Sequence, residues 1–228
     1  MRATELAKKT IAGMIDSALL EADVTPDKVK ALCKVAAKYG FYAVDVNSCY
    51  VRLAKRLLLQ MKSPVKVLST ISFPLGQEST EAKVAEARQA FADGADEIDV
   101  MLNVGMLKVK DHRYVANEIH KVIEVAKRFG QDKFVKVILE TGLLNQNEIV
   151  QACRIVKSVG ADFVKTGTGY VKKATVQDVT LIRKVVGQDF GVKASGGIKT
   201  PEQAFALIKA GANRIGSSHA KEIIDAIH

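Results

Sequence analysis

A regular alternation of β-rich runs with amphipathic helical patterns is the feature of this sequence that most restricts its fold. Four times a glycine closes a helical pattern and a β-rich run follows, within residues 39–47, 93–103, 159–169 and 210–218. Glycine just past the end of a helix adopts the left-handed conformation that terminates it, so these glycines mark turns from helix to strand. Four further β-rich runs cover residues 13–20, 65–73, 134–141 and 191–197.

The segments between these runs have apolar residues at i, i+3, i+4 and i+7, which predicts helices over residues 25–39, 79–92, 115–129, 147–159 and 200–210. Thr25 and Thr200 each precede a proline, a typical helix start. Eight strand–helix units predict an α/β fold of the (β/α)8 TIM-barrel type. A doubly wound sheet is the alternative, but it gives no reason for eight evenly spaced units. We expect a single domain over residues 1–228, with a short N-terminal helical segment at about residues 1–10.

The composition indicates a globular protein with acidic ligands. The apolar share is 48%, and the formal net charge of +9 favours phosphorylated metabolites or nucleic acid. Lys and Arg are spread along every segment and Trp is absent, so we expect no nucleic-acid partner.

The three cysteines form no CxxC pair, and they indicate neither a disulfide framework nor a metal site. Cys33 and Cys153 fall in helical patterns and are expected in the core. Asp16 interrupts the first apolar run, and no run has the length of a membrane span. We therefore expect a cytoplasmic protein with no membrane partner.

Charged residues at the expected strand ends indicate a site inside the barrel. Strand residues alternate between the barrel interior and the surrounding helices, and the fully apolar face must pack on the helices. This rule sends inward Asp99, Lys136, Glu140, Lys165 and Lys193, and it adds Asp45 as a further candidate. One strand-end lysine alone is most simply a solvated charge, but buried charges are costly unless paired, so the group argues for a functional site.

A pair of inward lysines has a specific chemical use. A neighbouring ammonium and an apolar wall lower the pKa of a lysine, and its neutral amine then attacks a carbonyl to form a Schiff base. Asp99 could move the protons of such a reaction. This is the chemistry of a class I aldolase, which needs neither metal nor cofactor.

Glycine-rich loops follow the last three expected strands as TGTGY (166–170), SGGIKT (195–200) and GSSHAKE (216–222). Backbone N–H groups approach anions closely at glycine, and loops after strands seven and eight commonly bind phosphate in such barrels. The sequence therefore predicts a phosphate site beside the lysines.

The segments GADEIDVMLNVGMLK, VKVILETGLL, GADFVKTGTGY, GVKASGGIKT and RIGSS together resemble deoxyribose-phosphate aldolases over about residues 14–220. The resemblance implies a class I aldolase that reversibly cleaves 2-deoxy-D-ribose 5-phosphate to D-glyceraldehyde 3-phosphate and acetaldehyde, as a homodimer or homotetramer. It implies that Lys165 is the Schiff-base lysine, Lys193 the second lysine and Asp99 the proton-relay aspartate. Substrate or phosphate binding is expected at Asp16, Gly169, Gly196, Gly197, Lys199, Gly216, Ser217 and Ser218, and Asp45, Lys136 and Glu140 are expected to line the site.

Several positions depart from the pattern of the family. IDSALLEADVT stands where IDHTLLKPDAT is common, so Ser17, Ala18 and Glu21 replace His, Thr and Lys. Asp45 replaces a common cysteine, and His219 replaces a second serine. These changes leave open a Schiff-base aldolase with a different sugar-phosphate or aldehyde substrate. A non-catalytic protein that binds sugar phosphate or nucleic acid is a third hypothesis, which the lysine pair and Asp99 disfavour.

Overall fold

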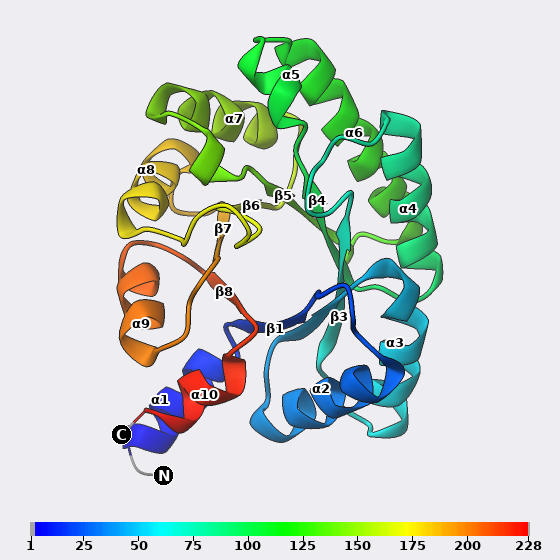
Figure 1. The fold of residues 1–228 in the computed structure, drawn as a ribbon, viewed down its shortest axis with the longest axis vertical. Helices are drawn as coiled ribbons and strands as arrows, with labels where there is room; N and C mark the ends of the chain where they lie inside the picture. Colours follow the sequence, from blue (N-terminus) through cyan, green and yellow to red (C-terminus); the bar gives the residue numbers. More distant parts are fainter. Residues whose placement is uncertain (1–2, 228) are drawn as a thin grey trace.

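The computed structural model describes residues 3–227. Eight parallel strands in this part of the chain pair in sequence order and close into one barrel, with the helices outside (Figure 1). The strands are β1 (Ile15–Leu19), β2 (Ala43–Val46), β3 (Lys66–Ile71), β4 (Glu97–Met101), β5 (Phe134–Ile138), β6 (Phe163–Lys165), β7 (Gly191–Ser195) and β8 (Arg214–Ser217). Each lies inside one of the eight expected runs, and the predicted (β/α)8 barrel is confirmed.

Helices connect the strands and surround them. They are α1 (Ala3–Ala12), α2 (Pro26–Tyr39), α3 (Val51–Gln60), α4 (Thr80–Ala92), α5 (Val104–Lys108), α6 (His112–Phe129), α7 (Gln146–Ser158), α8 (Val176–Val186), α9 (Pro201–Lys209) and α10 (Ala220–Asp225), with short 3-10 helices at Ser48–Tyr50 and Thr141–Leu143. Residues 1 and 2 of the expected N-terminal helical segment lie outside the described residues, and α1 packs beside α10 (Figure 1). None of the described helices is long and apolar enough to cross a membrane.

The helix boundaries follow from their capping residues. The Thr25 and Thr200 side chains accept hydrogen bonds from the backbone N–H groups of Lys28 and Gln203, each with proline in the first turn. Gly40 ends α2 in the left-handed conformation, with a φ of 68°. Positive φ angles are also found at the three other glycines that were predicted to separate helix from strand, Gly94, Gly160 and Gly211.

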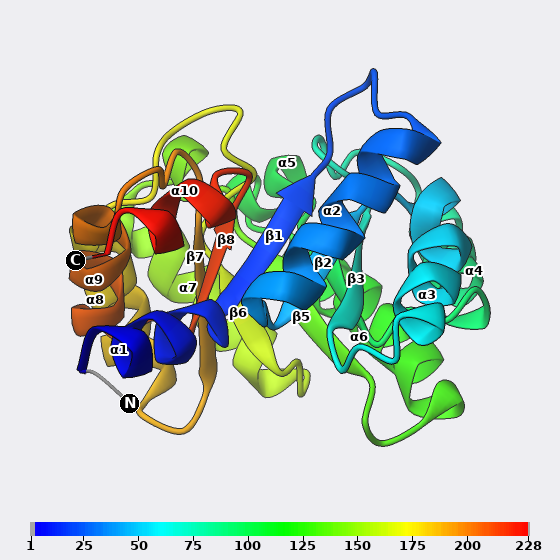
Figure 2. The same ribbon diagram turned by 90° about the horizontal axis from the view of Figure 1, so that it is seen from below.

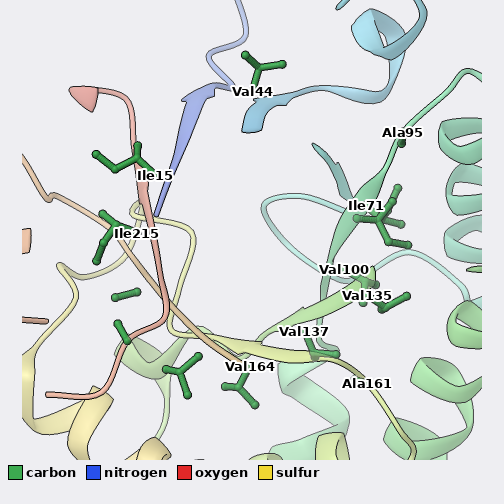
Figure 3. Packing of buried hydrophobic residues seen from close by; sticks show 14 of the residues in the cluster. Ile15, Val44, Ile71, Ala95, Val100, Val135, Val137, Ala161, Val164 and Ile215 are labelled. Carbon is green, nitrogen blue, oxygen red and sulfur yellow. The ribbon is translucent and has the colours of Figure 1, made fainter. Parts of the chain in front are cut away.

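The main core lies between the barrel and the helices. Outward-facing strand residues such as Val135, Val137 and Val164 are fully or almost fully buried, and Figure 3 shows these side chains on the side of the strands that faces the helices. Cys33 and Cys153 are fully buried in the same core, as predicted, and burial raises the pKa values of these thiols to about 11 and about 12. The opposite strand faces are thereby left to line the barrel interior.

One buried ion pair joins two helices to the end of the barrel that carries the loops. Lys83 of α4 is fully buried, and its Nζ donates to the carbonyls of Gly76 and Met101 and to Glu118 Oε1 of α6, at 2.8, 3.0 and 2.7 Å. Burial lowers the pKa of Lys83 and raises that of Glu118. Each partner therefore relies on the other for its charge.

Replacing Lys83 with methionine is expected to lower the free energy of unfolding by about 3–5 kcal/mol, because a buried carboxylate loses its partner. The matched control is Lys121→Met, which breaks a pair between the same two helices, at 3.5 Å from Glu81 and 46% exposed on the lysine side. That exposed pair should contribute less than about 1 kcal/mol. Urea unfolding of both variants measures the difference, and equal losses would show that burial does not set the value of the Lys83 pair.

Candidate active site

A cavity of ≈ 390 Å³ opens at the carboxyl-terminal ends of the strands. In Figure 2 the loops after β1 and β6 rise at this same end of the barrel. The cavity wall includes nine of the predicted site residues, which are Asp45, Lys165, Gly169, Gly196, Gly197, Lys199, Gly216, Ser217 and Ser218. The predicted phosphate loops and the predicted nucleophile therefore share one cavity.

Lys165 and Lys193 meet at a single carboxylate oxygen. They are Cα partners in the pairing of β6 with β7, so their side chains leave the sheet at the same height. Asp99 of β4 reaches them across the barrel, and its Oδ2 lies 2.7 Å from Lys165 Nζ and 2.8 Å from Lys193 Nζ. The structure thus brings together the three residues predicted for catalysis, with one carboxylate shared by two amines.

Neighbouring charges stabilise the charged forms of Asp99 and Lys193. Burial favours the neutral acid, but Lys165, Lys193 and Lys136 outweigh it and hold the pKa of Asp99 well below its usual range. Burial likewise opposes the ammonium of Lys193, but Asp16, Asp99 and Asp45 outweigh it and raise its pKa. Asp99 is therefore a carboxylate and Lys193 an ammonium at neutral pH.

A second set of buried ion pairs, outside the cavity wall, contacts Lys193 and Asp99. Asp16 of β1 binds Lys193 Nζ at 2.7 Å and Arg214 Nη1 at 2.9 Å, and it does not line the cavity. Lys136 is fully buried between Asp99, at 3.3 Å from Oδ1, and Glu97. Asp16 was predicted to bind substrate and Lys136 to line the site, but the structure places both in the support of the lysine pair.

The position of Glu140 differs from its prediction, and the reason is local backbone geometry. Strand β5 ends at Ile138, so the alternation that sent Glu140 inward no longer applies two residues later. Glu140 has a left-handed backbone with a φ of 56°, and its Oε2 accepts from the N–H of Thr168 at 3.0 Å. Glu140 therefore holds the loop after β6 and does not line the cavity.

The two glycine-rich loops after β6 and β7 pack directly on each other. A Cβ added to Gly169 would lie 3.2 Å from the Cα of Gly196, and both glycines have positive φ angles. Ser195 Oγ donates to the carbonyl of Gly167 at 2.6 Å, which ties the same two loops together. Because Gly169 and Gly196 have no side chains, the two loops can approach each other closely at the edge of the cavity.

Two aromatic residues of the cavity wall were not predicted from the sequence. Phe73 follows β3 and its ring lies 5.8 Å from Lys165 Nζ, and Tyr170 of the loop after β6 stacks edge-on against it. The sequence signal that could have indicated Phe73 is its place at the end of the expected β-rich run 65–73, where strand ends line the site. These rings supply the apolar wall beside the amine.

Among residues 3–227, no group of three or more His, Cys, Asp or Glu side chains is arranged to hold a metal ion. The chemistry available in the cavity is that of an amine, its carboxylate partners and a polar loop edge.

Comparisons with known proteins agree with this geometry. A family model described as DeoC/LacD family aldolase matches residues 10–222. The deoxyribose-phosphate aldolase of Thermococcus kodakarensis is 51% identical over 219 residues, which cover 96% of this chain and 97% of that protein. The deoxyribose-phosphate aldolase of Caldanaerobacter subterraneus subsp. tengcongensis is 50% identical over 216 residues, which cover 94% of this chain and 92% of that protein.

A solved structure shows the same architecture. The deoxyribose phosphate aldolase of Aeropyrum pernix, described as a unique tetrameric structure, superposes with a TM-score of 0.89 at 32% identity, over 97% of this chain and 94% of that one. The family match over most of the chain and the relatives at about half identity lead to one conclusion: this chain belongs to the DeoC/LacD family of aldolases.

Proposed function

We propose that this aldolase reversibly cleaves 2-deoxy-D-ribose 5-phosphate to D-glyceraldehyde 3-phosphate and acetaldehyde through a Schiff base on Lys165. One observation carries the proposal: Lys165 is the lysine that lies in the cavity wall and also shares the Asp99 carboxylate with a second buried lysine. The names of the relatives at about half identity support the choice of substrate.

The reaction follows from a neutral Lys165 amine. It attacks the C1 aldehyde of the open-chain sugar, water leaves, and an iminium ion remains on Nζ. Loss of the C3 hydroxyl proton then breaks the C2–C3 bond, and the electron pair moves into the iminium to give an enamine. Glyceraldehyde 3-phosphate leaves, the enamine is protonated at C2, and water releases acetaldehyde. Asp99 and Lys193 orient the amine and relay protons through bound water.

The phosphate of the substrate would bind where the loops after β7 and β8 meet. Gly196, Gly197 and Lys199 lie in the first of these loops, and Ser218 lies in the second, two residues before α10. Backbone N–H groups at such a rim and the ammonium of Lys199 favour an anion. This position leaves the sugar aldehyde free to extend toward Lys165.

A different sugar phosphate is the second candidate. Ala18 and Glu21 line the cavity together with Asp45, and all three differ from the residues common in related aldolases. Turnover with a panel of 2-deoxy and 2-hydroxy sugar phosphates, measured by the release of each product aldehyde, tests the choice. A higher kcat/KM for any other sugar phosphate than for 2-deoxyribose 5-phosphate would overturn the proposed substrate.

Changing Lys199 to glutamine is expected to raise KM for 2-deoxyribose 5-phosphate about 10- to 100-fold, because a charged contact to phosphate contributes roughly 1.5–3 kcal/mol. KM for unphosphorylated 2-deoxyribose should stay unchanged. Lys209→Gln is the matched control, since it removes the same charge at the exposed far end of α9. Equal effects on both sugars, or equal effects of both variants, would place the phosphate elsewhere.

We also propose that the chain assembles as a homodimer or homotetramer and acts in the cytoplasm on small phosphorylated sugars and aldehydes. The tetramer described for the relative from Aeropyrum pernix supports assembly. The three free cysteines, of which Cys49 is exposed, fit a reducing compartment. Light scattering of the purified protein measures the assembly.

A further inference from the structure

Asp45 of β2 is the one carboxylate of the lysine network that lines the cavity. The other acidic members, Asp16, Glu97 and Asp99, do not belong to the cavity wall. A group that exchanges protons directly with a bound substrate must reach the cavity, and within this network only Asp45 and Lys165 do so.

Asp45 is also the most loosely held carboxylate of the network. Asp16 and Asp99 each have cationic partners within 2.9 Å, whereas the nearest cations to Asp45 Oδ2 are Lys193 Nζ at 3.5 Å and Lys165 Nζ at 3.9 Å. Its Oδ1 is buried and has no hydrogen-bond partner among residues 3–227. An unpartnered buried carboxylate oxygen that belongs to a cavity wall is available to a ligand.

We propose that Asp45 is a catalytic acid–base residue, which accepts the proton that Lys165 must lose and returns it to the hydroxyl of the carbinolamine. The inference rests on the proposed Schiff-base function and extends it to a residue with a role of its own. It assigns the formation and hydrolysis of the Schiff base to Asp45.

The proton steps balance with no other reactant. The Lys165 ammonium gives one proton through a bridging water to the Asp45 carboxylate, whose Oδ2 lies 3.9 Å from Nζ, and an amine and a neutral acid remain. The amine nitrogen bonds to the aldehyde carbon, and its second proton moves to the oxygen, which becomes a hydroxyl. Asp45 then protonates that hydroxyl, the C–O bond breaks, water leaves, and the nitrogen lone pair forms the iminium. Asp45 ends as a carboxylate, and the reverse sequence releases the product aldehyde.

The distances fit a direct transfer from Asp45 to the carbinolamine hydroxyl. The carbinolamine hydroxyl is two bonds from Nζ, about 2.4 Å away. An acid that donates to it at about 2.7 Å can lie up to roughly 5 Å from Nζ, and Asp45 Oδ2 lies at 3.9 Å. Asp99 Oδ2, at 2.7 Å from Nζ, is instead placed to accept from the nitrogen itself.

The pKa values of Asp45 and Asp99 also differ in the way that these two roles require. Burial raises the pKa of Asp45 to about 6, and the attraction of Lys193 and Lys165 only partly opposes it. A group of that pKa exchanges protons near neutral pH, whereas Asp99, with its pKa well below the usual range, does not hold one. The charged groups that act on Asp45 come from four other strands, and they are Asp16 of β1, Asp99 of β4, Lys165 of β6 and Lys193 of β7. Its register partners Ala18 of β1 and Leu68 of β3 are uncharged.

The test is the rate of Schiff-base formation with acetaldehyde, followed from pH 5 to pH 8 by borohydride quenching and mass spectrometry of the Lys165 peptide. In the unmodified chain the rate should fall below about pH 6, about tenfold per pH unit, because Asp45 is then already protonated and cannot accept the proton of Lys165. Asp45→Asn should form the adduct about 100-fold more slowly at pH 7, and its pH profile should lose the break at about pH 6, because no group of that pKa remains to accept the proton. Asp45→Ser, a second neutral replacement, should behave in the same way.

Asp96→Asn is the matched control. Asp96 is also a buried carboxylate, but it precedes β4 at the opposite end of the barrel, where it accepts from Val67 N–H and binds Lys55. This variant should keep both the rate and the acidic fall of the unmodified chain. An unchanged rate in Asp45→Asn, or a break near pH 6 like that of the unmodified chain, overturns the inference while the proposed function stands. No Lys165 adduct in the unmodified chain overturns both.

Discussion

Lys165→Ala is expected to lower turnover of 2-deoxyribose 5-phosphate by at least about 10⁴-fold, since removal of a covalent nucleophile eliminates the route that the rest of the site serves. Borohydride reduction in the presence of the sugar phosphate should leave a stable adduct on Lys165 of the unmodified chain and none on the variant. Peptide mass spectrometry locates the adduct.

Two alternative explanations of the result can be separated by this experiment, a different nucleophile and a disturbed ion network. Lys199 is the other lysine of the cavity wall, so an adduct on Lys199 would contradict the assignment of the nucleophile. Loss of Lys165 also removes a cation at 2.7 Å from Asp99, and a fall in activity could then reflect a disturbed network. Lys165→Arg is the matched control, because it keeps a positive charge beside Asp99 but has no nucleophilic amine. It should fold with a stability near that of the unmodified chain and be as inactive as Lys165→Ala.

The barrel could be predicted from the sequence because its signals are local. Glycines at helix ends, threonine–proline starts and apolar periodicity each depend on a few neighbouring residues, and every expected strand and helix has a counterpart. The helices α3, α5 and α8 had no individual prediction, and α8 (VQDVTLIRKVV) is rich in β-branched residues that lower helix propensity. Alternation also identified the inward position of Asp99, Lys165 and Lys193, because all three lie within strands.

Contacts across the barrel could not be predicted in the same way. Residues 99, 165 and 193 meet at one carboxylate oxygen because three strands far apart in the sequence converge there, and no pattern within a strand specifies such a distance. Glu140 shows the limit of the alternation rule, which fails where a strand ends. Asp45 shows another limit: the sequence indicates a carboxylate inside the barrel, but its looser contacts and its place in the cavity wall depend on the whole fold.

Lys193→Met is expected to lower kcat/KM by about 10³-fold through the charge balance of the network. Without the ammonium of Lys193, Oδ2 of Asp99 contacts Lys165 alone, and this carboxylate oxygen then favours the ammonium form, which cannot attack. Asp45 also loses its nearer cation, at 3.5 Å, and its pKa rises further above about 6. A protonated Asp45 cannot accept the proton of Lys165. The pH below which the rate of Lys165 trapping falls should therefore move upward from about 6 in the variant.

The same substitution breaks a fully buried ion pair, which is expected to cost about 3–5 kcal/mol of stability and roughly 10 °C of melting temperature. Lys136→Met provides the matched control, since Lys136 is equally buried and also touches Asp99, but on Oδ1. It should lose a similar amount of stability and much less turnover, because Lys165 and Lys193 still share Oδ2. If Lys193→Met loses stability but turns over substrate at the unmodified rate, the role of Lys193 is structural and not catalytic. A loss of turnover with the pH dependence of the unmodified chain would show that Lys193 acts on the substrate and not through the charge balance of the network.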